Sequence, residues 1–173
     1  MTAIRLRRSV PFALVALALV VGSIIAAGPA RAGGPGKPPR AMTLIGSGAV
    51  VGIADLGQAG ASPGDIRTLS LTLKTAKGAT VGRAEIVQTL TRQADGLGTA
   101  VKSVVMTLTN GAVTASGTTT FSDFTSPNGR PDDRIEQIAI TGGTGRYDGA
   151  SGSVDITILP EFRSEWVLRF SQS

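Results

Sequence analysis

The stretch "ITGGTGRYDGASG", residues 140–152, places five glycines around the only tyrosine of the chain, Tyr147. A phosphate-binding loop would follow a strand and lead into a helix, whose N-terminal amides meet the anion. Here the glycines lead directly into "GSVDITIL", residues 152–159, which has the composition of a strand. We therefore interpret the stretch as a corner between two strands, where glycines supply positive φ angles or close backbone approach. Tyr147 and Ala150 would then cover one end of a β structure.

The rest of the chain from Met42 onward has the same all-β pattern. Alternating or β-branched segments recur between Gly, Asn, Asp and Pro, and no segment has a helical period. The clearest alternation is in "IRTLSLTLK", residues 66–74, where three leucines share one face and Ser or Thr the other. The pattern predicts strands at residues 42–54, 66–74, 79–92, 100–109, 112–120, 134–141, 152–159 and 163–171.

The links between these strands predict how they pair. They are too short for parallel crossovers, and Asn110-Gly111 between two strands is a strong hairpin signal. Closing an even number of antiparallel strands removes the exposed edges. We therefore predict an eight-stranded antiparallel up-and-down β-barrel, whose interior has room for side chains or one small ligand.

The N-terminus predicts export. Arg5, Arg7 and Arg8 precede an apolar run at 12–27, and Ala30-Arg31-Ala32 offers a cleavage site, so residues 1–32 resemble a secretory signal peptide. The run is shorter than the roughly 20 residues of a spanning helix. An uncleaved anchor and twin-arginine export are the alternatives. Residues 33–41 form a flexible Gly/Pro leader and residues 42–173 the barrel domain. We expect a secreted, extracellular protein with no membrane association after cleavage.

The amino-acid composition excludes several kinds of partner, catalytic site and metal site. The formal charge of +5 falls to about +1 without the signal peptide, so it indicates no nucleic-acid partner. The chain has no Cys and no His, which excludes disulfides, thiol nucleophiles, Ser-His-Asp triads and the usual zinc sites. Acid–base chemistry falls to Asp, Glu, Lys, Arg or Tyr147. We expect no metal and no cofactor.

Two further features bear on the surface. The segment "SDFTSPNGRPDDR", residues 122–134, lacks the ligand spacing and terminal Glu of a calcium loop, so we expect a charged loop over the barrel mouth. An outer-membrane barrel is disfavoured because aromatic girdles are missing. We also assign Lys74, Arg83 and Lys102 to the outward faces of the strands, where a membrane barrel would be apolar.

The order of several motifs resembles the allene oxide cyclase-like barrel family, which also contains the plant dirigent proteins. The motifs are "GDI" (64–66), "GATVGRAEIVQTL" (78–90), "LTNGAVTASG" (108–117), "IAITGGTGRYDGASGSVDI" (138–156) and "TILPEFRSEWVLRF" (157–170). The resemblance covers about residues 42–171. It implies an eight-stranded barrel of the calycin type, often assembled as a homo-oligomer. Plant cyclases of the family act on an allene oxide derived from a fatty acid, and dirigent relatives bind phenoxy-type intermediates.

Polar residues on the strands supply the candidate site. Glu85 and Gln88 lie among apolar neighbours, and an inward carboxylate would have a raised pKa suited to acid–base work. We assign Glu85 as the catalytic candidate and Gln88, Tyr147 and Trp166 as ligand-binding candidates. An outward, solvated Glu85 and a packing role for Tyr147 are the alternatives. Glu136, Asp155 and Glu165 share the ambiguity of Glu85, whereas Asp65 is expected to make strand-end hydrogen bonds.

Three functions stay open. The chain can be an intramolecular, cofactor-independent isomerase or cyclase that holds a small hydrophobic substrate. It can be a dirigent-like or lipocalin-like module that binds a small hydrophobic or phenolic ligand without chemistry of its own. It can also be a structural envelope protein with a solid barrel. The volume and lining of the barrel interior discriminate among them.

Overall fold

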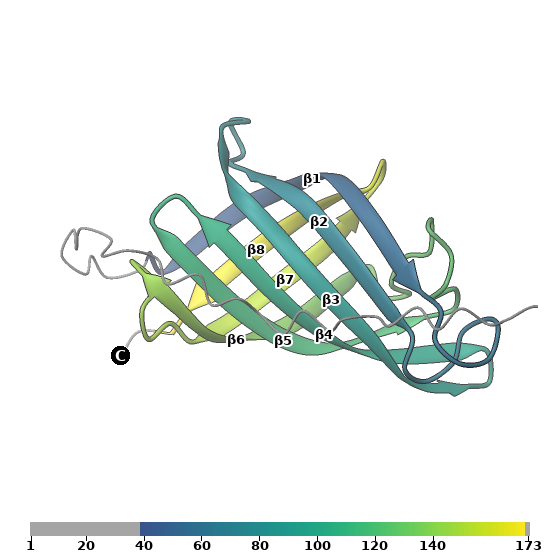
Figure 1. Cartoon of the computed structure of the whole chain (residues 1–173). Coiled ribbons are helices and arrows are strands. Elements are labelled where there is room, and N and C mark those ends of the chain that lie inside the picture. The colour runs from purple at the N-terminus through teal and green to yellow at the C-terminus, as the bar shows by residue number, and fades with distance from the viewer. Residues whose placement is uncertain (1–38, 172–173) are drawn as a thin grey trace, which may run out of the picture. The chain divides into compact units, whose positions relative to one another are not determined.

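The computed structural model describes residues 39–171, which form a closed eight-stranded barrel (Figure 1). Each strand pairs antiparallel with the next one along the chain, and the last pairs with the first. The strands are β1 (Ala41–Ala54), β2 (Ile66–Lys74), β3 (Thr80–Ala94), β4 (Leu97–Leu108), β5 (Gly111–Phe121), β6 (Ile135–Gly145), β7 (Gly152–Leu159) and β8 (Arg163–Phe170). The predicted all-β barrel is confirmed.

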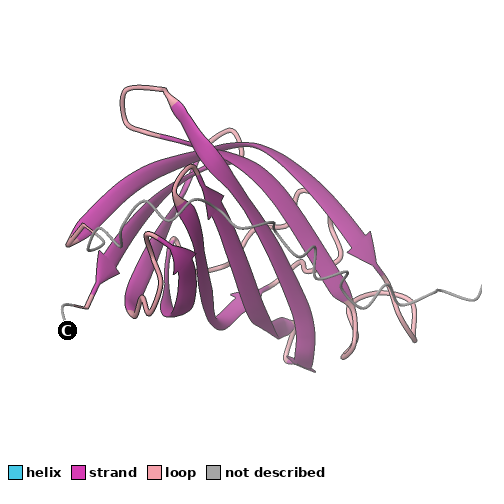
Figure 2. Cartoon of the chain, turned by 60° about the vertical axis from the view of Figure 1, so that its left-hand side comes forward, coloured by secondary structure: helices cyan, strands magenta, loops and turns pink. Residues whose placement is uncertain are grey.

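Strands and loops account for every residue from 39 to 171 (Figure 2). That part of the chain contains no helix long and apolar enough to span a membrane. The predicted signal peptide and most of the Gly/Pro leader lie outside the described residues. Secretion therefore stays a prediction from sequence.

Two of the predicted links between strands were too long. Strands 79–92 and 100–109 were expected to leave a seven-residue link, but β3 and β4 are joined by Asp95 and Gly96 alone. Both residues have positive φ, 53° and 78°, as a type I′ hairpin turn requires. The strand expected to end at 141 continues as β6 to Gly145, so the glycine segment begins inside a ladder with β5.

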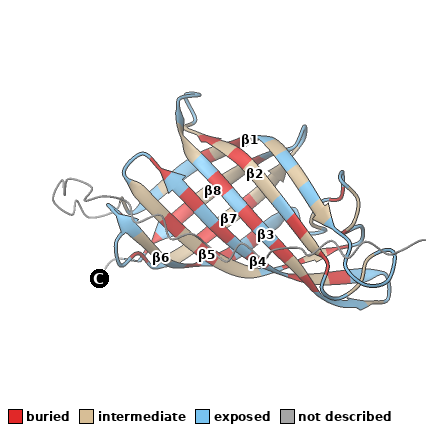
Figure 3. Cartoon of the chain, in the orientation of Figure 1, coloured by how far each residue is buried: buried red, intermediate tan, exposed pale blue. Residues whose placement is uncertain are grey.

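The barrel interior follows the alternation of the strands (Figure 3). On β4, every second residue from Gly98 to Leu108 is buried, and the residues between them are exposed except for the half-buried Thr99. On β1 a bulge changes this parity: Gly48, at φ 67°, adds one residue relative to β2. As a result, Leu44 and Gly46 face inward before the bulge, whereas Ala49 and Val51 face inward after it.

One end of the barrel, which we call the closed end, contains the turn 146–151 and both the start of β1 and the end of β8. Tyr147 is 5% exposed and stacks on Phe170, with ring centroids 5.7 Å apart. Ala150 is buried beside it in the same apolar cluster. The expectation that Tyr147 and Ala150 cover a barrel end is therefore confirmed.

The opposite end, which we call the open end, contains the loops 55–65 and 122–134 and the turns at 95–96 and 160–162. Asp65 organises the first of these loops, accepting hydrogen bonds from the amides of Leu56 and Ser62, both at 2.7 Å. Asp65 is fully buried. This is the strand-end role expected from the sequence.

Two neighbouring valines on β4 test the inside–outside assignment. Val104 is 1% exposed and Val105 is 43% exposed. We expect Val104→Ala to lower the free energy of unfolding by about 2 kcal/mol, because it removes buried methyl groups and leaves a cavity. Val105→Ala should change it by about 0.5 kcal/mol or less. Urea denaturation of both variants measures the difference, and equal losses would contradict the assignment.

Candidate functional site

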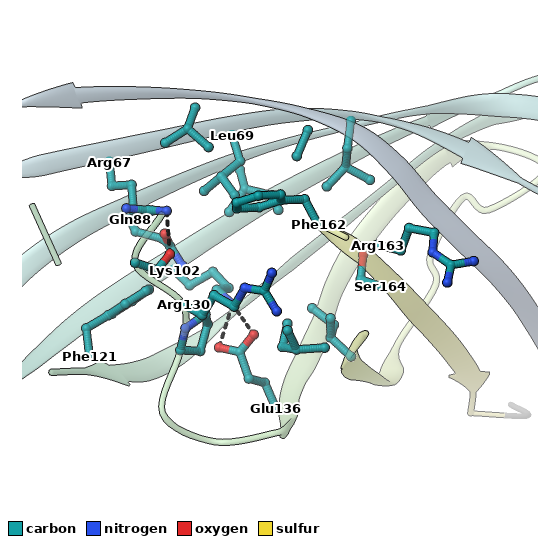
Figure 4. A pocket seen from close by; sticks show the side chains of 18 of the residues that line it. Arg67, Leu69, Gln88, Lys102, Phe121, Arg130, Glu136, Phe162, Arg163 and Ser164 are labelled. Atoms are coloured by element: carbon teal, nitrogen blue, oxygen red, sulfur yellow. Dashed lines mark hydrogen bonds and ion pairs between the residues drawn. The ribbon is translucent and has the colours of Figure 1, made fainter. Parts of the chain in front are cut away.

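A cavity of about 80 Å³ opens at the open end of the barrel (Figure 4). One water needs roughly 10–15 Å³ measured in this way, so the space holds several waters or a small molecule. Its walls are mostly apolar side chains from β1, β2, β3, β7 and β8, with a few polar groups among them. The lining includes Ala49, Arg67, Leu69, Ile86, Gln88, Lys102, Arg130, Glu136, Ile158, Phe162 and Trp166.

A buried ion pair lies in the wall of this cavity. The Lys102 ammonium is 2.6 Å from each carboxylate oxygen of Glu136, and the two side chains are 3% and 2% exposed. The assignment of Lys102 to an outward face was wrong. Lys102 has the same parity on β4 as buried Ala100 and Val104, and that parity, not its charge, decides its direction.

Lys102 and Glu136 come from strands that are not neighbours. Lys102 on β4 pairs with Gly117 on β5, and Glu136 lies on β6, beyond β5. Gly117 has no side chain to block the approach of the two groups. The β5–β6 ladder also ends at Ser116 and Ala139, short of the open end. The pair therefore links β4 to β6 at a level where β5 still pairs with β4 but no longer pairs with β6.

Burial governs the electrostatics of this pair. Desolvation lowers the pKa of Lys102, while the charge and the hydrogen bonds of Glu136 oppose that shift. Removing either partner would leave a buried charge without compensation. The pair is thus a strong, directed dipole inside a mostly apolar wall.

Gln88 lies next to the ion pair, because it pairs with Lys102 across the β3–β4 ladder. Its side chain is 2% exposed and lines the cavity. The carbonyl oxygen Oε1 is buried and has no hydrogen-bond partner. An unpaired buried acceptor costs about 1–3 kcal/mol, so the cavity offers a hydrogen-bond position to a donor on a ligand.

Arg67 fastens the loop 122–134 over the open end. Its guanidinium donates to the carbonyl oxygens of Phe124 (3.2 Å), Ser126 (2.5 Å) and Gly129 (2.6 Å), and it is 2% exposed. Desolvation lowers the pKa of Arg67, and the charge of Asp123 opposes the shift. The expected charged loop over the barrel mouth is confirmed, and Arg67 is the residue that holds it.

The mouth itself is bounded by Phe162 and Arg130, from opposite sides. The Arg130 guanidinium lies 4.9 Å from the ring centroid of Phe162, and both side chains are exposed. Glu161 and Phe162 form the turn between β7 and β8 with positive φ, 60° and 55°. Such backbone conformations cost of order 1–3 kcal/mol for a bulky residue and occur often at ligand sites.

The structure separates the four predicted site residues. Gln88 and Trp166 line the cavity. Glu85 instead points outward: it is 51% exposed, accepts a hydrogen bond from Ser70 and pairs with Arg83 at 3.0 Å. It lies three positions before Gln88, so the two side chains take opposite faces of β3. A carboxylate acting inside the barrel is therefore not Glu85. Tyr147 lies at the closed end, away from the cavity.

Sequence reasoning missed most of the polar wall. Arg67 and Lys102 were not among the predicted site residues, and Glu136 was only one of several ambiguous carboxylates. Of the others, Asp155 lies outside, bonded to Gln137 and paired with Arg169. Parity would have found Lys102 and Glu136, because each alternates with buried apolar residues on its strand. Within residues 39–171, no three Asp or Glu side chains gather as a metal site would require.

Solved structures share this barrel at low sequence identity. A pyocyanin demethylase matches with a TM-score of 0.60 and 21% identity, over 76% of this chain and 99% of that one. A heme-binding cyclase of neoabyssomicin biosynthesis matches with a TM-score of 0.57 and 19% identity, over 78% of this chain and 66% of that one. The chain thus spans less than two thirds of that cyclase. A pterocarpan synthase dirigent protein matches with a TM-score of 0.50 and 13% identity, over 77% and 86%.

No protein-family model matches the chain, and no curated protein matches its sequence. The structural likenesses show the fold: an eight-stranded barrel of the kind found in cyclases and dirigent proteins. The resemblance to the allene oxide cyclase-like and dirigent-like barrels is confirmed at that level.

The buried ion pair leads to a prediction about the free energy of unfolding. Lys102→Met leaves the Glu136 carboxylate buried and alone, so we expect it to lower the free energy of unfolding by about 3–5 kcal/mol. The double variant Lys102→Met with Glu136→Met removes both charges and should recover most of this loss. Urea denaturation of the two proteins measures the recovery. A double variant no more stable than the single one would contradict our account of the pair.

A separate prediction concerns Tyr147, whose ring stacks on that of Phe170. Tyr147→Phe should leave ligand binding at the open end unchanged and shift the free energy of unfolding by about 0.5 kcal/mol or less. Tyr147→Ala should cost about 3–5 kcal/mol through the lost packing. Thermal and urea unfolding check both, and a binding defect in Tyr147→Phe would place the tyrosine in the ligand site.

Proposed function

We propose that the chain binds one small hydrophobic or phenolic molecule in the open end of the barrel and acts on it as a cofactor-independent cyclase or isomerase. The observation that carries the proposal is the cavity: an apolar wall with an unpaired Gln88 acceptor beside the buried Lys102–Glu136 pair. Ligand-binding pockets typically combine an apolar wall with a few convergent polar groups in this way. The fold it shares with cyclase and dirigent barrels supports the class of reaction.

In this proposal, the apolar body of the ligand lies against Leu69, Ile86 and Trp166. A hydroxyl or amine on the ligand donates to Gln88 Oε1, which fixes its orientation. The Lys102–Glu136 dipole then faces the reacting part of the molecule from a low-dielectric wall, where fixed charges stabilise a polarised transition state strongly. Folding a substrate into one reactive conformer supplies the rest of the effect. An intramolecular rearrangement consumes no co-reactant.

The chain carries its own reporter for binding, because Trp166 is its only tryptophan and lines the cavity. We expect p-cresol and cyclohexanol to change Trp166 emission in a saturable way. Ala49→Phe fills the cavity from β1 and should weaken binding at least about tenfold, that is by about 1.4 kcal/mol. Val50→Phe is the matched control, since Val50 is 70% exposed on the outer face.

If Ala49→Phe and Val50→Phe bind the probes with equal affinity, the ligand does not bind inside the barrel. Native mass spectrometry of the protein from its own host gives an independent check. Ligand-free spectra across repeated preparations, together with no response of Trp166 to either probe, would favour a structural protein instead.

The second candidate is a non-catalytic, dirigent-like or lipocalin-like binding module. It is favoured by the position of Glu85, because the wall offers one carboxylate, Glu136, and that group is already paired. A bound ligand recovered chemically unchanged after long incubation would support the binding module over the enzyme.

A further inference from the structure

Lys102 is set apart from the other lysines of the described chain. Lys74 and Lys77 lie at the closed end, around the β2–β3 turn, where solvent reaches them. Lys102 is 3% exposed and lines the open-end cavity, whose other walls are mostly apolar, with its amine against Glu136. A lysine desolvated in an apolar pocket is the type of residue that attacks carbonyl groups.

We propose that Lys102 forms an imine with a small apolar aldehyde or ketone that enters the cavity. Glu136 moves the protons of this reaction, and Gln88 holds the oxygen atom that leaves. The inference rests on the proposed function in one respect, since it requires a small apolar molecule to enter the open end. It adds a covalent step and a chemical class of ligand.

Glu136 solves the usual difficulty of lysine chemistry at neutral pH. An exposed lysine, with a pKa of about 10.4, is almost entirely an ammonium, which has no lone pair to attack with. Here Glu136 receives two hydrogen bonds from the ammonium, so one proton can pass between them and give a neutral amine and a neutral acid. Desolvation lowers the pKa of Lys102, which favours its neutral amine. No proton needs to come from or leave to solvent.

The atoms balance in three steps. The lone pair of the Lys102 amine attacks the carbonyl carbon, and the electrons of the C=O π bond move to oxygen. The Glu136 acid protonates that oxygen and then takes a proton from the nitrogen, which gives a carbinolamine. Return of the proton to the hydroxyl releases water, and the nitrogen lone pair forms the C=N bond, which leaves a protonated imine beside the Glu136 carboxylate.

Gln88 takes part in these reaction steps. It pairs with Lys102 across the ladder and lines the same cavity, so the two side chains project side by side into it. The carbinolamine has a hydroxyl that can donate to the unpartnered Oε1 of Gln88. The buried acceptor that is costly in the free protein would thereby be satisfied in the intermediate.

The experiment traps the imine in the wild-type protein. We would incubate it with butanal and sodium cyanoborohydride at pH 7, which reduces an imine to a stable secondary amine, and map the adducts by peptide mass spectrometry. We expect Lys102 to be labelled at least about tenfold faster than Lys74 or Lys77, because of the three only Lys102 lines the cavity and has a carboxylate beside its amine. Pre-filling the cavity with p-cresol should slow labelling of Lys102 alone.

Two variants provide the controls. Lys102→Met with Glu136→Met removes the amine without leaving a buried charge, and should lose the fast adduct while keeping the slow ones. Lys74→Arg with Lys77→Arg should retain the fast adduct at the wild-type rate. Labelling of Lys102 no faster than that of Lys74 and Lys77 overturns the proposal.

The outcomes also separate this proposal from the proposed function. If Lys102 stays unlabelled while p-cresol still changes Trp166 emission, the imine chemistry is wrong and ligand binding stands. If Lys102 is labelled quickly and Trp166 responds to no probe, the imine proposal stands and non-covalent binding of cresol-like molecules is wrong.

Discussion

The ladder between β1 and β8, from Ala41 with Arg169 to Gly46 with Ser164, closes the sheet on itself. Everything else in the described chain depends on this closure. A chain without cysteine has no disulfides to hold a sheet edge, and an open edge would leave backbone donors and acceptors to pair with other chains. Closure pairs those groups internally and turns one face of every strand toward a shared interior.

The interior is not filled uniformly. Toward the closed end and through the middle it is an apolar cluster with Leu44, Leu73 and Met106 fully buried. A smaller cluster, with the rings of Phe121 and Phe124 edge to face at 5.2 Å, lies under the loops of the open end. The polar wall formed by Arg67, Gln88, Lys102 and Glu136 faces the cavity near that end.

This polar wall lowers the free energy of unfolding relative to an apolar one, and we therefore infer that it serves a function. A buried ion pair is often no better than a pair of apolar side chains of the same size, and an unpaired acceptor is worse. Arg67 makes the loop 122–134 part of the cavity, since four carbonyl oxygens of that loop accept from it. The strained turn at Glu161 and Phe162 is on the same rim. Costly features therefore gather at one end of an otherwise well-packed barrel.

The sequence by itself determined the fold, because strand alternation and turn residues are local signals: "IRTLSLTLK" shows which face is apolar, and Asn110-Gly111 marks a hairpin. It also placed Gln88 among the candidates for the interior. The site depended on facts that are not local. Glu85 and Lys102 have the residue types of exposed side chains, yet strand parity turns one out and the other in. The bulge at Gly48 brings Ala49 to the cavity, and Lys102 meets Glu136 across β5 at a level where β5 no longer pairs with β6. Register and long-range pairing are set by closure of the whole sheet, so only the tertiary structure decided which polar groups share the barrel interior.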